Sequence, residues 1–193
     1  TGKVRAAAPR RPNGQAAKDQ TVQIVVPDLD VPDVFMRDHM AGRLYNYLPT
    51  DIETKLPFHI NGDFYPSTDR KNIDNDHPNH RDWNSWVFRG IGECLAAALP
   101  SLLERFAGEP EKLYQRLPIK TASPLVAPII ELFFDAARKL PIFYTYDGWR
   151  TAERTCWVAK DLRPVADKVD LRLMAQPLQT AAWELINKFG VKE

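Results

Sequence analysis

Hydrophobic and polar residues alternate in residues 21–26 and 58–65, and residues 43–48 form a third strand-like stretch. Alternation with a period of two is typical of a β-strand that has one buried face. Residues 58–65 separate into an apolar side, Phe58, Ile60, Gly62 and Phe64, and a polar side, His59, Asn61, Asp63 and Tyr65. We therefore expect an antiparallel or mixed sheet of these three strands, in which a short polar loop joins residues 43–48 to residues 58–65.

A long helix is predicted over residues 83–106, because apolar residues recur there at intervals of three and four. These residues are Trp83, Val87, Ile91, Leu95, Leu99, Leu102 and Phe106. Asp82 or Asn84 can cap the start of the helix, and Gly108 lies just past its end, where a left-handed residue is favoured. Residues 74–82, which precede this helix, have the composition of a loop.

Three shorter helices are expected in the second half of the chain, at residues 110–117, 123–140 and 177–189. Pro110 suits the first position of its helix, and Gly190 suits the end of the last one. Between these helices, the β-rich residues 141–146 meet Asp147-Gly148, which is a strong hairpin signal. A partner strand is therefore expected from Trp149.

The order of these elements predicts an α+β fold, with helices packed on one face of the sheet and a C-terminal hairpin with helices. We divide the chain into a basic linker or tail (1–20), an α+β middle domain (21–140) and a hairpin with a helical extension (141–193), which can begin a further subdomain. Residues 1–20 contain five basic residues and no apolar period. They are expected to be a solvated linker, and the alternative is a basic arm that contacts phosphate.

Composition narrows the function classes only slightly. The formal net charge of the 193-residue chain is +1, so there is no bulk electrostatic attraction to nucleic acid or to an anionic membrane. Cys94 and Cys156 lack CxxC spacing, which favours free thiols in a reducing compartment. No apolar run reaches the roughly 18 residues of a membrane span. We therefore expect a cytoplasmic protein without a membrane partner, and a chain that is a piece of a longer protein.

Candidate chemistry lies mainly in residues 67–71, Ser-Thr-Asp-Arg-Lys, a turn-forming tract that ends in two cations. A loop arginine suggests phosphate binding, although an exposed loop cation often serves only solubility. Neither GxGxxG nor GxxxxGK[ST] occurs, so this chain alone is not expected to hold a nucleotide tightly. His77 and His80 are spaced so that they can share a metal ion with a carboxylate, or they belong to a solvated loop. His59 is expected to be a structural histidine rather than a base.

Three tracts together are similar to the segment that follows the ATP-binding domain in sacsin-type proteins. These tracts are residues 42–49 (GRLYNYLP), 56–64 (LPFHINGDF) and 67–71 (STDRK), and residues 141–149 (PIFYTYDGW) resemble a downstream element of the same proteins. Sacsin-type proteins are relatives of the ninety-kilodalton heat-shock chaperones, within the GHKL (histidine kinase-like) ATPase group. The resemblance covers roughly residues 21–149.

The resemblance implies a middle, or transducer, domain whose loop reaches back to the γ-phosphate of ATP. In the chaperones an arginine in an Asn-x-Ser-Arg-Glu pattern has this role, which falls by position on Arg70, with Lys71 as a helper in place of the acidic residue. ATP and Mg²⁺ would be held by a separate N-terminal domain that is not in this chain, so the chain has no complete active site. His59 and Asn61, on the polar side of their strand, are expected to brace the arginine loop.

The implied partners are the protein's own nucleotide-binding domain, protein clients or nucleic acid, and a second copy in a homodimer. Two alternatives stay open. One is a non-catalytic module of the same fold that binds protein or nucleic acid through Tyr45, Tyr47, Trp86 and Trp149 with the basic arm. The other is a small metallohydrolase centred on His77 and His80.

Overall fold

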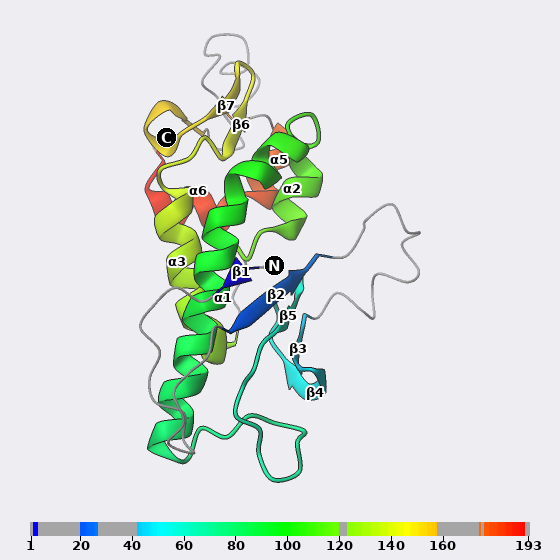
Figure 1. Ribbon diagram of the computed structural model, residues 1–193. Coiled ribbons are helices and arrows are strands. Elements are labelled where there is room, and N and C mark those ends of the chain that lie inside the picture. Colours follow the sequence, from blue (N-terminus) through cyan, green and yellow to red (C-terminus); the bar gives the residue numbers. More distant parts are fainter. Residues whose placement is uncertain are drawn as a thin grey trace. The chain divides into compact units, whose positions relative to one another are not determined.

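The structure is a computed structural model, and it describes residues 2–3, 20–26, 42–119, 123–157, 174 and 176–191. Within them lie a five-stranded sheet, a two-stranded hairpin and several helices (Figure 1), so the predicted α+β class is confirmed. The basic tract 4–19 and its predicted linker or arm lie outside the described residues.

The chain forms two compact units. The first comprises Thr1–Ala98 and Thr121–Phe133, and the second comprises Leu99–Lys120 and Phe134–Glu193. Two helices, α1 (Pro78–Arg105) and α3 (Ala127–Ala137), each contribute residues to both units. The division at residues 20 and 140 that the sequence suggested stays a prediction.

The sheet of the first unit has the strand order β1-β2-β5-β3-β4. Its strands are β1 (Gly2–Lys3), β2 (Thr21–Val25), β3 (Arg43–Asn46), β4 (Leu48–Glu53) and β5 (His59–Asn61). Ile60 of β5 lies opposite Ile24 of the antiparallel β2 and opposite Leu44 of the parallel β3. The three predicted strands are therefore present and the sheet is mixed, but β5 ends at Asn61, so the predicted strand is wrong for residues 62–65.

The short polar loop predicted between residues 48 and 58 is wrong for residues 49–53, which belong to β4. This strand pairs antiparallel with β3, and the register shifts between Arg43 and Tyr45. Two buried threonines supplement the irregular pairing: Thr50 Oγ1 donates to the Leu44 carbonyl at 2.7 Å, and Thr54 Oγ1 donates to the Gly42 carbonyl at 2.8 Å. β4 escaped prediction because its sequence, LPTDIE, shows no clean alternation.

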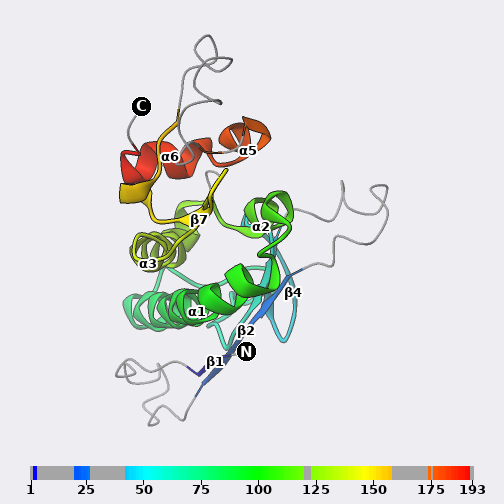
Figure 2. The same ribbon diagram turned by 90° about the horizontal axis from the view of Figure 1, so that it is seen from above.

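Helix α1 packs against β5 and the residues that follow it. The Phe64 and Phe88 rings lie 4.7 Å apart, and Trp83 Nε1 donates to the Asp63 carbonyl at 2.6 Å. Gly62 permits this close approach, since a Cβ there would lie 2.7 Å from Val87 Cγ1. On another side, Gly92 lies against α3, where a Cβ would meet Leu132 Cδ1 at 2.8 Å, and the two helices run side by side in both views (Figure 1 and Figure 2).

The ends of α1 differ from the prediction. The helix begins at Pro78, so the predicted loop is wrong for residues 78–82, and so is the cap at Asp82 or Asn84. Proline fits here because the first helical turn has no partner for its N–H. Leu103 is buried where Leu102 was expected, and Gly108 does not adopt a positive φ.

α1 is long and apolar enough to cross a membrane by length and composition, and half of its most apolar window is buried inside the structure. The core helix of a soluble protein passes the same test, so this is weak evidence. Among the described residues no other helix meets the criterion.

The second unit contains the predicted hairpin and short helices. Its described elements beyond α1 and α3 are α2 (Pro110–Arg116), β6 (Phe143–Thr145), β7 (Gly148–Arg150), a 3₁₀ turn (Ala152–Arg154), α5 (Gln176–Ala181) and α6 (Trp183–Phe189). The Asp147-Gly148 turn is confirmed, because Thr145 pairs with Gly148. The single helix expected at 177–189 is instead two helices, and Gly190 ends the second one at φ 61° as predicted.

Buried Tyr114 joins α2 to the hairpin. Its hydroxyl donates to the Ile142 carbonyl at 2.8 Å and accepts from the Tyr144 N–H at 3.0 Å. Burial raises the pKa of this phenol above its ordinary value. Trp149 Nε1 donates to the Ala107 carbonyl at 2.8 Å, which fixes the other strand of the hairpin.

Candidate phosphate-contacting loop

Residues 66–73, which carry the predicted arginine, close into a small hairpin that we call the arginine loop. Pro66 and Ile73 form an antiparallel bridge, and Ser67 N–H donates to the Asn72 carbonyl at 2.9 Å. At the tip, Arg70 N–H donates to the Ser67 carbonyl at 2.9 Å, so residues 67–70 form a tight turn. The loop therefore has a defined backbone path.

Two side chains of the loop hold this turn. Ser67 Oγ donates to Asp69 Oδ1 at 2.6 Å and accepts from the Asn72 N–H at 3.1 Å. Asp69 Oδ1 also accepts from the Lys71 N–H at 3.0 Å. The hydrogen bond from Ser67, followed by that from Lys71, holds the pKa of the Asp69 carboxyl below its ordinary value. The carboxylate is thereby engaged within the turn.

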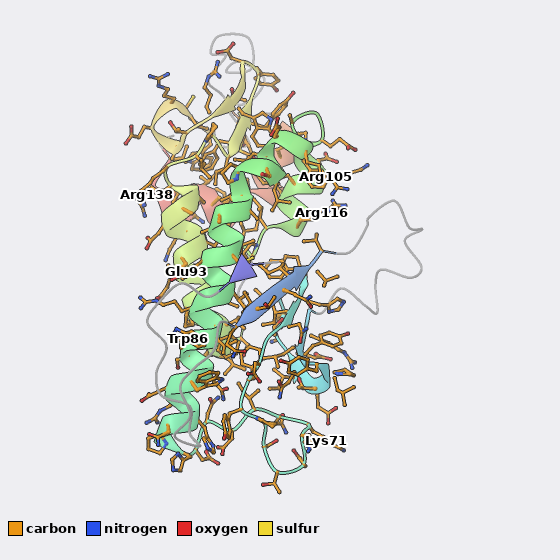
Figure 3. The ribbon with its side chains drawn as sticks, in the orientation of Figure 1. Lys71, Trp86, Glu93, Arg105, Arg116 and Arg138 are labelled. Atoms are coloured by element: carbon orange, nitrogen blue, oxygen red, sulfur yellow. The ribbon has the colours of Figure 1, made fainter. Side chains whose placement is uncertain are left out.

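Arg70 lies at the tip with an unusual backbone. Its φ of 59° is in the left-handed region, which costs an L-residue other than glycine roughly 1–2 kcal/mol. Arg70 and Lys71 are both exposed, and among the described residues neither side chain has a hydrogen bond or ion pair. Lys71 is labelled on this loop in Figure 3. The loop thus presents two cations to its surroundings.

The arginine loop is attached to the sheet and to α1. Asp51 N–H of β4 donates to the Lys71 carbonyl at 2.8 Å. At the base of the loop, buried Asn84 of α1 accepts from the Tyr65 N–H at 2.7 Å and donates to the Asp74 carbonyl at 2.8 Å. Asn84 is therefore a clamp for the loop, rather than the helix cap that its residue type suggested.

His59 and Asn61 lie on the polar side of β5, as predicted, and their hydrogen bonds support β3 and its turn. His59 Nδ1 accepts from the Arg43 N–H at 3.0 Å. Asn61 Oδ1 accepts from the Tyr47 N–H at 3.1 Å, and Asn61 Nδ2 donates to Gln23 Oε1 at 2.9 Å. A bracing role for the arginine loop stays a prediction for both residues.

The two histidines before α1 belong to a side-chain cluster with Asp74 and Tyr65. His80 Nδ1 lies 2.6 Å from Asp74 Oδ2, and the His80 ring stacks on Tyr65 at 4.0 Å and lies 4.6 Å from the His77 ring. The hydrogen bond with His80 is the first cause of a lowered pKa at the Asp74 carboxyl. Within the described ranges, no group of three or more His, Cys, Asp or Glu residues could hold a metal ion.

The four aromatics of the interaction-module alternative differ in exposure. Trp86, labelled in Figure 3, is 8% exposed and packs on Trp83 with ring centroids 5.0 Å apart. Tyr45 is half-buried beside the His59 ring, and Trp149 is half-buried beside the Tyr144 ring. Tyr47 alone of the four is largely exposed, at 76%.

No family model matches this chain, and no curated protein or solved structure matches it either. The likeness to the middle domains of GHKL ATPases therefore rests on the sequence tracts given above.

Proposed function

We propose that this chain is the middle domain of a GHKL-type ATPase of the sacsin-like or chaperone-like kind. In this proposal Arg70 contacts the γ-phosphate of ATP that a separate N-terminal domain holds with Mg²⁺, and Lys71 adds a second positive charge. The observation that carries the proposal is the exposed Arg70, held at φ 59° by a turn whose own carboxylate accepts from Ser67 Oγ and the Lys71 N–H and does not pair with the guanidinium.

The chemistry of the arginine side chain supports this role. A guanidinium stays charged at any physiological pH and offers paired donors that match two phosphate oxygens. In other phosphoryl-transfer enzymes, an arginine supplied from outside the nucleotide site accelerates the reaction by about 10³- to 10⁵-fold. Backbone strain of the kind seen at Arg70 is common at functional sites, where the surrounding structure maintains it.

The attachments of the arginine loop support a role in transmitting the nucleotide state. An arginine that lies on a different domain from ATP can act only after the domains dock, so hydrolysis depends on a conformational change. The bonds from Asp51 and Asn84 connect the loop to β4 and to α1. Movement of the loop toward phosphate would therefore be transmitted to both β4 and α1.

The test is ATP turnover of the full-length protein that contains these residues, compared with its Arg70→Ala variant. We expect turnover to fall by about 10³-fold or more while nucleotide affinity changes little. Arg89→Ala, at an exposed arginine of α1, is the matched control and should keep wild-type turnover. Unchanged turnover in Arg70→Ala would remove Arg70 from the mechanism.

A non-catalytic interaction module is the second candidate, and the exposure of Tyr47 favours it. If Arg70→Ala has no effect and the isolated chain binds DNA or RNA more weakly as salt rises, this candidate should lead.

A further inference from the structure

Tyr47 and Leu48, at the turn between β3 and β4, are unusually exposed for large hydrophobic residues. Tyr47 is 76% exposed and Leu48 is 69% exposed, the highest values among the large hydrophobics of the described residues. Val25, on β2, follows with 53%. Two adjacent exposed residues of this kind make a small apolar tip, which we call the hairpin tip.

The hairpin tip is held in place by an unfavourable backbone conformation. Tyr47 adopts a φ of 62°, where glycine or asparagine is the usual residue of a tight hairpin turn. The bond from Tyr47 N–H to Asn61 Oδ1 at 3.1 Å fixes this conformation, and Gln23 in turn holds the Asn61 amide. A turn that served only to reverse the chain would gain stability from asparagine, so an aromatic side chain here points to a role for the ring.

The hairpin tip and the arginine loop are attached to the same edge strand. β4 is the last strand of the sheet, and it begins at Leu48. Three residues later, Asp51 N–H donates to the Lys71 carbonyl at 2.8 Å. With about 3.3 Å per residue, the apolar tip lies roughly 10 Å along β4 from the point where the loop is attached.

We infer that the hairpin tip and the arginine loop form one docking surface for a folded protein that presents bound phosphate. This inference rests on the proposed function, and the partner is the nucleotide-loaded domain. The tip supplies the apolar anchor, because tyrosine is enriched among the residues that contribute most to binding at protein interfaces. The loop supplies charge complementarity, since Arg70 and Lys71 lack an ion-pair partner among the described residues.

In this arrangement the hairpin tip and the arginine loop have different roles. Docking depends on the tip, whereas acceleration of hydrolysis depends on Arg70. Loss of the tip should therefore weaken docking before any chemistry occurs, and loss of Arg70 should leave much of the docking intact. Single truncations at interface anchors commonly weaken association about tenfold or more.

The test uses hydrogen exchange of the full-length protein, with and without a non-hydrolysable ATP analogue and Mg²⁺. Wild type should show nucleotide-dependent protection of residues 44–50 and 66–73. Tyr47→Asn keeps a residue that tolerates the left-handed turn, and Leu48→Ser removes the aliphatic anchor. Each is expected to lose most of the nucleotide-dependent protection of residues 66–73 and about tenfold in turnover.

Val25→Ser is the control, because it removes an exposed hydrophobic residue of β2 away from the tip and should change neither readout. Wild-type protection and turnover in both tip variants would overturn the inference, while a collapse of turnover in Arg70→Ala would leave the proposed function intact. Loss of DNA or RNA binding in the tip variants, with nucleotide-dependent protection unchanged, would also overturn it and assign the tip to nucleic acid.

Discussion

Two tight turns of this protein each contain one residue at positive φ, and they differ in which residue it is. The β6–β7 hairpin has Gly148 at φ 89°, and the arginine loop has Arg70 at φ 59°. Glycine adopts this region without a steric penalty, whereas arginine does not. The β6–β7 hairpin therefore has the residue that suits its backbone, whereas the arginine loop has a residue that carries a conformational cost there.

The two turns also differ in what their carboxylates do. A hydroxyl group stabilises each turn: Thr145 Oγ1 donates to the Gly148 carbonyl at 2.8 Å, and Ser67 Oγ donates to Asp69 Oδ1 at 2.6 Å. In the hairpin, Asp147 forms an ion pair with Arg150. In the arginine loop, Asp69 accepts from a hydroxyl and a backbone N–H instead. A carboxylate can thus stabilise a turn without neutralising the arginine of that turn.

The largest effect is expected when Arg70 is replaced by glycine, the residue that the β6–β7 hairpin has at positive φ. Arg70→Gly in the full-length protein should lower ATP turnover by about 10³-fold or more, because the guanidinium is lost. The free energy of unfolding should stay the same or rise by up to about 1 kcal/mol, since glycine relieves the positive-φ strain. Turnover assays and denaturant unfolding measure the two effects. A large loss of stability would mean that the Arg70 side chain is needed for the fold.

A smaller effect is expected from removal of the carboxylate that holds the turn. Asp69→Ala should reduce turnover by up to about 10²-fold, because a misplacement of about 1 Å has consequences of this size. Asp69→Asn retains an oxygen that can accept from the Lys71 N–H, so it should keep most of the activity. Equal losses in both variants would indicate that the charge of Asp69, rather than its hydrogen bonds, is required.

Gly148→Ala tests the other turn. The alanine Cβ has open space, but the φ of 89° strains any residue with a side chain, so the variant should lose about 1 kcal/mol of unfolding free energy. Gly108→Ala is the matched control, with equal space and no positive φ. Denaturant unfolding of the two variants side by side gives the difference, and equal stability would contradict the conformational explanation.

The smallest effect is expected in the acid titration of the Asp69 carboxyl. Because the pKa of Asp69 is lowered in the folded protein, the stabilisation from its hydrogen bonds is fully present above pH 3.8, the ordinary pKa of the carboxyl. This stabilisation is lost as pH falls through the lowered pKa. An NMR titration of the Asp69 carboxyl should report a value below 3.8. Ser67→Ala removes the hydrogen bond that is the first cause of this shift, so it should raise the pKa of Asp69 toward the ordinary value. A titration unchanged by Ser67→Ala would contradict this cause.

Strong local patterns predicted the regular elements well. The two-residue period of residues 58–65 predicted both faces of β5, and Asp147-Gly148 predicted the hairpin. Elements without such patterns were missed. β4 contains Pro49, which is disfavoured in strands, and the polar Thr50 at its buried position, and the first turn of α1 has a loop-like composition. The pairing of β4 and the packing of the first turn of α1 depend on residues distant in sequence, which local patterns do not describe.

The arginine loop was predicted by residue type but not by conformation. Nothing in the order Ser-Thr-Asp-Arg-Lys indicates a positive φ at Arg70, because arginine rarely adopts one. Asn84 has the residue type of a helix cap, and only the tertiary structure brings it to Tyr65 and Asp74. The Asp51 attachment likewise depends on β4, which the sequence did not predict.

The sharing of α1 and α3 between the two units has a practical consequence for dissecting the protein. The first unit ends at Phe133, whereas the second begins at Leu99. Any continuous gene fragment that encodes all of one unit therefore also encodes residues 99–133 and, with them, part of the other. Domain swaps with other proteins must carry this overlap as a block, since a junction placed inside it splits one unit's sequence between two parents.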